Sequence, residues 1–86
     1  MAKVYVGNLA SSVTSRDLAE LFSRAGYVRG ALAICDKSGA CRGFGFVQMA
    51  ELDEAVVAVS LLNHTELKGR RITIEPLPDR RASRLD

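Results

Sequence analysis

The chain has 86 residues, which is enough for one hydrophobic core and too few for two, so we expect a single domain. Hydrophobic residues make up 48% and charged residues 26%, which excludes disordered and collagen-like proteins, while the net charge of +2 favours no class of partner. No apolar run approaches the length of a membrane span, and the start lacks the apolar stretch of a signal peptide. Two cysteines are too few for the disulfide scaffold of a small secreted protein. We therefore expect a cytoplasmic protein.

The first third of the chain predicts a strand followed by a helix. β-branched and aromatic residues dominate residues 3–8, which favours a strand. Thr14 and Asp17 have the spacing of a capping box at a helix start. Gly26 is expected to end this helix in the left-handed conformation. Apolar residues at helical spacing form one face of this helix: Leu18, Leu21, Phe22 and Ala25.

The rest of the chain predicts a hairpin, a second helix and a last strand. The hairpin consists of strands over 28–35 and 41–49, joined by a short polar loop that contains glycine. The helix over 52–62 begins with acidic residues, and Asn63 is expected to end it. A strand over 71–75 follows, and Pro76 and Pro78 cannot donate hydrogen bonds to a sheet, so the sheet should stop there. The core face of this second helix has four members: Ala55, Ala58, Val59 and Leu62.

This order predicts an α+β protein with the β-α-β-β-α-β ferredoxin-like fold. Two helices would cover one face of a four-stranded antiparallel sheet, and the other face would remain open to solvent. We expect the domain to occupy residues 1–76 and a basic, flexible tail to occupy residues 77–86. Function should lie on the open face of the sheet.

Three of the five aromatic residues are predicted on that open face. Alternation along a strand places Tyr5 on the open face of the first strand, while Val4 and Val6 face the core. Alternation along the third strand places four residues on the same open face: Arg42, Phe44, Phe46 and Gln48. Rings left in water gain nothing from burial, whereas unpaired bases stack on them with about 1–3 kcal/mol each.

Two motifs identify a resemblance to a known family. Residues 42–49 read Arg-Gly-Phe-Gly-Phe-Val-Gln-Met, which matches seven of the eight positions of the RNA recognition motif (RRM) octamer. Residues 4–9, Val-Tyr-Val-Gly-Asn-Leu, are similar to the hexamer of the same family. Met49 is the one position that departs from the octamer. Its side chain is expected to face the core, so the departure should alter packing more than binding. The layout is similar to that of stand-alone single-domain RNA-binding proteins of bacteria and cyanobacteria.

The resemblance implies a role for each motif residue. It implies that Tyr5 and Phe44 each stack a base, that Phe46 packs against a sugar, and that Arg42 pairs with a phosphate. Gly43 and Gly45 would leave room for the helices behind the sheet. Single-stranded RNA is the implied partner, and single-stranded DNA is a second candidate, since stacking does not need the 2′-hydroxyl.

The charge is distributed unevenly along the chain. Residues 1–43 carry +3, residues 44–67 carry −4 and residues 68–86 carry +3, so the acidic block lies mostly on the second helix, behind the sheet. Basic side chains near the open face are candidates for phosphate contacts. The candidates are Lys3, Arg29, Lys37, Arg70, Arg71, Arg80, Arg81 and Arg84. Leu32 could pack under a base or under the tail.

The main alternative is a protein-interaction module on the same fold. It would use Val57 and Leu61 on the second helix, or the apolar surface of the second strand. An enzyme is disfavoured, because the chain has one histidine and the loop over 7–13 has no arginine to cradle phosphate, as it has in acylphosphatases. We expect a monomer that needs no cofactor, no metal and no membrane.

Two further residue types have simple expectations. Cys35 and Cys41 flank the hairpin loop and should both face the core, where they could sit opposite each other. We expect two small buried side chains rather than a disulfide. His64 is expected to be exposed after the second helix, too far from the cysteines for a zinc site.

Overall fold

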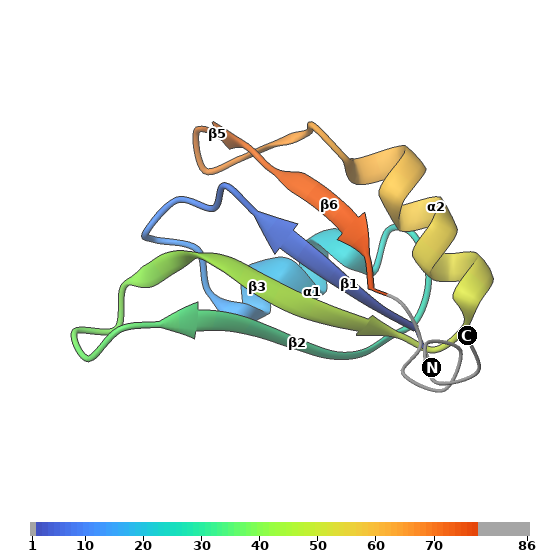
Figure 1. Ribbon diagram of the computed structural model, residues 1–86, viewed down its shortest axis with the longest axis horizontal. Coiled ribbons are helices and arrows are strands. Elements are labelled where there is room, and N and C mark those ends of the chain that lie inside the picture. The colour runs from blue at the N-terminus through green and yellow to red at the C-terminus, as the bar shows by residue number, and fades with distance from the viewer. Residues whose placement is uncertain (1, 78–86) are drawn as a thin grey trace, which may run out of the picture.

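Four strands form one antiparallel sheet in the order β2-β3-β1-β6, and two helices lie behind it (Figure 1). The structure is a computed structural model that describes residues 2–77. The element order confirms the predicted β-α-β-β-α-β ferredoxin-like fold. The elements are β1 (Ala2–Gly7), α1 (Ser15–Phe22), β2 (Val28–Cys35), β3 (Cys41–Met49), α2 (Leu52–Leu62), β4 (Glu66–Leu67), β5 (Arg70–Arg71) and β6 (Thr73–Pro76).

Side-chain caps fix the start of both helices. At α1, the Thr14 hydroxyl accepts from the Asp17 N–H at 3.1 Å, and the Asp17 carboxylate accepts from the Thr14 N–H at 2.9 Å. This reciprocal pair is the predicted capping box. At α2, the Glu54 carboxylate accepts from the Glu51 N–H at 3.0 Å, and Asn63 is the C-terminal cap, as predicted.

The α1 cap also holds the turn between β4 and β5. The Lys68 ammonium lies 2.8 Å from the Asp17 carboxylate and donates to the Ser12 carbonyl at 3.0 Å. The hydrogen bond from Lys68, followed by the one from the Thr14 backbone, lowers the pKa of the Asp17 carboxyl below its ordinary value. One carboxylate therefore stabilises contacts between segments more than 50 residues apart in the chain.

The loop between β2 and β3 is organised around Asp36. Its carboxylate accepts from the Ser38 hydroxyl at 2.6 Å, from the Ser38 N–H at 2.9 Å and from the Ala40 N–H at 3.1 Å. These bonds, the Ser38 hydroxyl first, lower the pKa of Asp36. Gly39 takes φ +91°, which a side chain would disfavour. The predicted hairpin is confirmed.

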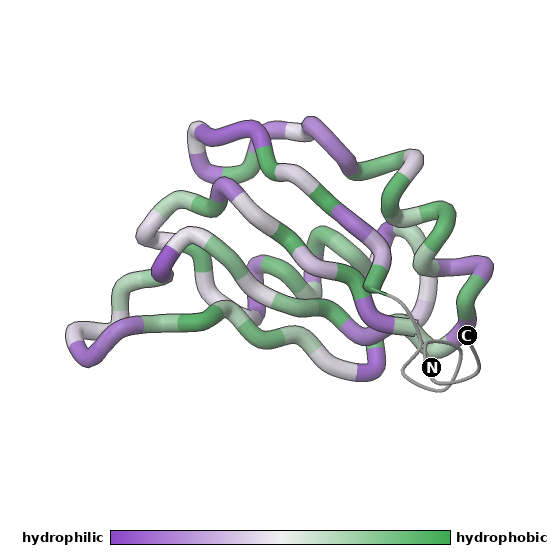
Figure 2. The backbone as a smooth tube through the Cα atoms, viewed as in Figure 1, coloured by the Kyte–Doolittle hydropathy of each residue, from purple (hydrophilic) through white to green (hydrophobic). Residues whose placement is uncertain are grey.

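The core lies between the helices and the rear face of the sheet. Val4 and Val6 from β1 are fully buried, and so is Met49 from β3, as predicted. Leu18 and Phe22 of α1 are fully buried as well. Figure 2 shows hydrophilic residues concentrated in the β2–β3 loop and in the β4–β5 region, outside this core. The helix layer thus occupies one face of the sheet and leaves the other free of helices.

The expectation for Gly26 was wrong. Helix α1 ends at Phe22 with Ser23 as its cap, and Gly26 does not adopt a positive φ. A Cβ on Gly26 would instead lie 2.6 Å from the Cγ and Cδ of Glu54. The absent side chain lets Glu54 reach across and accept from the Tyr27 N–H at 3.1 Å. Gly26 therefore serves a close approach between the α1–β2 connection and α2.

The expectation that both cysteines face the core was half wrong. Cys41 is buried, but Cys35 is exposed, and both are free thiols. The two residues are paired across β2 and β3 as expected. The pairing register shifts between Ala33 and Cys35, and this irregularity breaks the alternation from which the inward direction of Cys35 was predicted.

The last predicted strand is divided into two pieces. Residues 73–76 form β6 beside β1, whereas Arg71 belongs to β5, which pairs with β4 in a separate two-stranded sheet. The β4–β5 hairpin was not predicted, because each strand has only two residues and shows no periodicity. Gly69 occupies its turn at φ +90°. β6 ends at Pro76, and the next N–H, that of Leu77, donates to the Lys3 carbonyl at 3.0 Å.

Candidate nucleic-acid interface

Three aromatic rings lie together on the helix-free face of the sheet. Tyr5 comes from β1, and Phe44 and Phe46 come from β3, where they alternate with buried Gly45 and Val47. The two strands pair so that Tyr5 is opposite Phe46. The sequence prediction of one shared face is therefore correct for all three rings.

The rings contact one another at aromatic pair distances. The Tyr5 and Phe44 centroids are 6.2 Å apart with planes inclined by 23°, a stacked arrangement. Phe46 is edge-on to both, at 5.9 Å from Tyr5 and 6.2 Å from Phe44. All three are only half-buried, so this ring cluster of Tyr5, Phe44 and Phe46 keeps surface available to a ligand.

Glycines shape the ring cluster from beneath. A Cβ on Gly7 would lie 3.1 Å from the Tyr5 ring, so the Tyr5 side chain leans over Gly7. It leans toward Phe44, which is the residue that pairs with Gly7 on β3. A Cβ on Gly45 would lie 3.0 Å from Leu18 of α1, which confirms its predicted role in helix contact. Gly43 differs from the prediction: a Cβ there would meet only the Leu9 carbonyl oxygen, at 4.0 Å, and no helix, but the residue adopts φ +101°.

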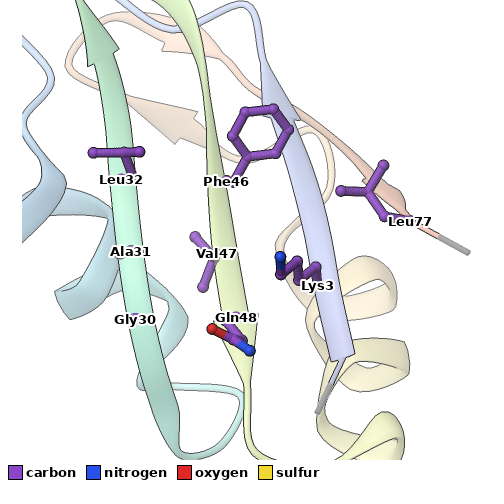
Figure 3. A pocket seen from close by; sticks show the side chains of 8 residues that line it. All are labelled: Lys3, Gly30, Ala31, Leu32, Phe46, Val47, Gln48 and Leu77. Atoms are coloured by element: carbon purple, nitrogen blue, oxygen red, sulfur yellow. The ribbon is translucent and has the colours of Figure 1, made fainter. Parts of the chain in front are cut away.

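A hollow of about 450 Å³ lies beside the ring cluster, between β1 and β2 (Figure 3). Lys3 and Gln48 pair across β1 and β3, and Gly30 pairs with Gln48 from β2. Leu32, predicted on this face, is 54% exposed and pairs with Phe46. The residues that line the hollow are Lys3, Gly30, Ala31, Leu32, Phe46, Val47, Gln48 and Leu77.

Gly30 and Leu77 were not predicted as site residues. Gly30 carries no side chain that periodicity could assign, and its contribution is the space above it. Leu77 falls outside the predicted last strand and reaches the hollow through its bond to Lys3. Neither contribution can be read from local sequence.

The arginines of the candidate interface differ in their environments. Arg42 on β3 and Arg71 on β5 are exposed, while Arg80 and Arg81 lie outside the described residues. The Arg70 guanidinium donates to the side-chain oxygen Oδ1 of Asn8 at 2.6 Å, and the side-chain amide of Asn8 donates to the Arg71 backbone carbonyl at 2.6 Å. This link could not be predicted from the sequence, because its ends are more than 60 residues apart.

The remaining surface contains features predicted for other functions. Val57 and Leu61 on α2 are 46% and 54% exposed, and His64 is exposed, as expected. In residues 2–77, no group of three or more His, Cys, Asp or Glu side chains is placed to hold a metal ion. Over the same residues, neither helix combines the length and the apolar character needed to cross a membrane.

Comparison with known proteins places this geometry in a family. A profile of the RNA recognition motif matches residues 4–73. The chain is 46% identical over 82 residues to "29 kDa ribonucleoprotein A, chloroplastic" of Nicotiana sylvestris, which covers 92% of this chain and 30% of that protein. It is also 46% identical over 74 residues to "Glycine-rich RNA-binding protein 1" of Mycosarcoma maydis, covering 85% of this chain and 42% of that protein. The chain thus spans less than half the length of these curated relatives.

Solved structures agree with this placement. The crystal structure of "RNA Binding Protein PG1" superimposes with a TM-score of 0.85 at 36% identity, covering 93% of this chain and 98% of that one. The structure of the "Rna15 RRM with bound RNA" has a TM-score of 0.82 at 24% identity, covering 90% and 83%, and supports the fold alone. The profile match and the likeness to a protein domain of nearly equal length show that the chain belongs to the RNA recognition motif family.

Proposed function

We propose that the chain binds single-stranded RNA on its open sheet face. The observation that carries the proposal is the ring cluster, in which three rings contact one another on the helix-free face and remain half-exposed. Flat rings in that position offer π-surfaces on which unpaired bases stack. Family membership and the names of the relatives, a ribonucleoprotein and an RNA-binding protein, support the same ligand.

The surroundings of each ring refine the expected roles. Tyr5 leans over Gly7 beside Phe44, which supports stacking at that end of the cluster. Phe46 was expected to pack against a sugar, but it borders the hollow, which gives a base room next to that ring. We therefore assign a base to Phe46 as well. Arg42, exposed at the start of β3, remains the proposed phosphate partner.

Substitution of Tyr5 tests the proposal. Tyr5→Ala removes one stacking surface and should weaken binding of a short single-stranded RNA by about 1–3 kcal/mol. The measurement is a fluorescence anisotropy titration with an end-labelled oligonucleotide. Unfolding in urea checks that the variant is folded.

Tyr27 supplies the matched control. Its ring is 67% exposed but lies in the α1–β2 connection, away from the ring cluster. Tyr27→Ala should leave the affinity unchanged. Stacking on the sheet would be rejected if the two variants lost RNA affinity equally, or if folded Tyr5→Ala kept the wild-type affinity.

Several narrower properties belong to the same proposal. Single-stranded DNA should bind too, since stacking surfaces do not read the 2′-hydroxyl. Arg71, Arg80 and Arg81 remain proposed phosphate contacts, and we propose that the chain acts as a monomer without catalysis. Localisation in the cytoplasm stays a prediction, and the Nicotiana sylvestris relative is a chloroplast protein.

A second candidate function is a protein contact through α2. Val57 and Leu61 are exposed on a helix that begins with acidic residues, and no lysine or arginine occurs from residue 44 to residue 67. Such a surface suits a partner segment with apolar and basic side chains.

An amphipathic lysine–leucine peptide tests the α2 surface. Chemical-shift changes on α2 that fall with added salt, and that Leu61→Ser removes, are the expected result. Changes confined to the sheet, or none at all, would contradict it. Wild-type RNA affinity of Leu61→Ser would show that the two surfaces act separately.

A further inference from the structure

The hollow beside Phe46 has the composition of a site that reads one base. Leu32 and Leu77 are apolar walls on two sides, and Phe46 presents a ring at one end (Figure 3). The polar groups are the Lys3 ammonium and the Gln48 amide, which come from paired positions of β1 and β3. Sites for small flat ligands combine apolar walls with a few convergent polar groups in this way.

Lys3 is the group with unused bonding capacity. Its ammonium makes no hydrogen bond and no ion pair to any residue within 2–77. Figure 3 shows its nitrogen turned toward β3, between Phe46 and Gln48. The backbone of the same residue is fixed, because the Lys3 carbonyl accepts from the Leu77 N–H at 3.0 Å. The backbone bond fixes where the exposed Lys3 side chain starts, and its ammonium lies at the wall of the hollow with three N–H groups that have no partner within residues 2–77.

An ammonium donates and cannot accept, which sets the chemistry of the base it favours. Uracil and guanine present an exocyclic carbonyl at the positions where cytosine and adenine present an amino group. An amino group facing Lys3 would place donor against donor. We propose that this hollow is a base-reading site in which Lys3 selects uracil or guanine over cytosine or adenine. The proposal rests on RNA binding by the open face.

Gly30 explains why the space exists. A Cβ at Gly30 would meet only the side-chain oxygen Oε1 of Gln48, at 3.9 Å, and the backbone there does not need positive φ. A side chain at this position would therefore enter the hollow without a clash. Gly30→Leu should fill the site and leave the three rings in place.

Short oligouridine and oligocytidine of equal length form the sharpest probe pair. They have the same charge and ring size and differ where a carbonyl replaces an amino group. Wild-type protein should bind oligouridine about tenfold more tightly, the contribution of one hydrogen bond to a charged group. Lys3→Met should reduce oligouridine binding to the level of oligocytidine. Gly30→Leu should likewise abolish the preference.

Lys37→Met is the matched control. It removes the same charge from the exposed β2–β3 loop, away from the hollow, so it should lower both affinities equally or not at all. The site is rejected if the wild-type protein binds oligouridine and oligocytidine with nearly equal affinity, or if folded Lys3→Met keeps the preference for oligouridine. It is also rejected if Lys3→Met lowers both affinities by the same factor, as Lys37→Met does. Binding of both oligonucleotides without preference leaves RNA binding standing, whereas binding of neither overturns that function too.

Discussion

At the scale of single residues, the open face combines attraction and repulsion. Glu75 on β6 pairs with Tyr5 on β1, which places an exposed carboxylate at the edge of the ring cluster. Within residues 2–77 this carboxylate makes no hydrogen bond and no ion pair. A phosphate chain crossing β6 would be repelled by it, while the bases are attracted to the rings. Glu75 should therefore limit affinity.

Removal of this charge gives a prediction. Glu75→Gln keeps the size of the side chain and removes the repulsion, so RNA affinity should rise by about two- to fivefold at low salt. The gain should shrink as salt is added. Titrations at two ionic strengths measure it. Glu66→Gln, an exposed site on β4, serves as the control, and an unchanged Glu75→Gln affinity at low salt would contradict a repulsive role.

At the scale of elements, two glycines on facing strands have opposite surroundings. A Cβ on Gly45 would lie 2.5 Å from the Leu32 carbonyl oxygen, a backbone atom that cannot move alone. Gly45→Ala should therefore destabilise the fold by about 1–3 kcal/mol through overpacking between β2, β3 and α1. Gly30→Ala should be nearly neutral, because its Cβ has space. Urea unfolding of both variants gives the comparison, and equal stabilities would refute it.

The same elements show how far sequence alone reaches. Long periodic segments such as β3 and α2 were predicted with their observed bounds, since alternation and caps are local properties. Gly26 and Cys35 were misassigned because their environments depend on Glu54 and on a register shift, neither of which is local. The hollow was not predicted for the same reason: it is lined by residues of β1, β2 and β3 together with Leu77.

At the scale of the whole molecule, the stability of the fold should decrease at low pH. The pKa values of Asp17 and Asp36 are lowered in the folded chain, so their bonds stabilise it above the unfolded pKa of about 4 and lose effect as the pH falls through the lower folded values. The free energy of unfolding should decrease below about pH 4.

Asp17→Asn tests the acid dependence. This variant cannot form the ion pair with Lys68, so it should be less stable at neutral pH and lose less stability on acidification than the wild type. Asp53→Asn removes an acidic group in the first turn of α2 that makes no hydrogen bond and no ion pair within residues 2–77. This variant should lose as much stability on acidification as the wild type. Urea unfolding at neutral pH and near pH 3 provides the data. If Asp17→Asn and the wild type lost the same stability on acidification, the role of Asp17 in the acid dependence would be contradicted.

The two register shifts in β2 have a consequence for self-association. β2 is an outer strand of the sheet, and outer strands with unpaired N–H and carbonyl groups can recruit another chain. The shifts between Val28 and Gly30 and between Ala33 and Cys35 leave only residues 30–33 in continuous regular pairing. Register shifts of this kind bend and twist a strand, so we expect β2 to offer a second copy a poorer template than a regular strand of the same length. We therefore expect the irregular strand beside the hollow to disfavour edge-to-edge association.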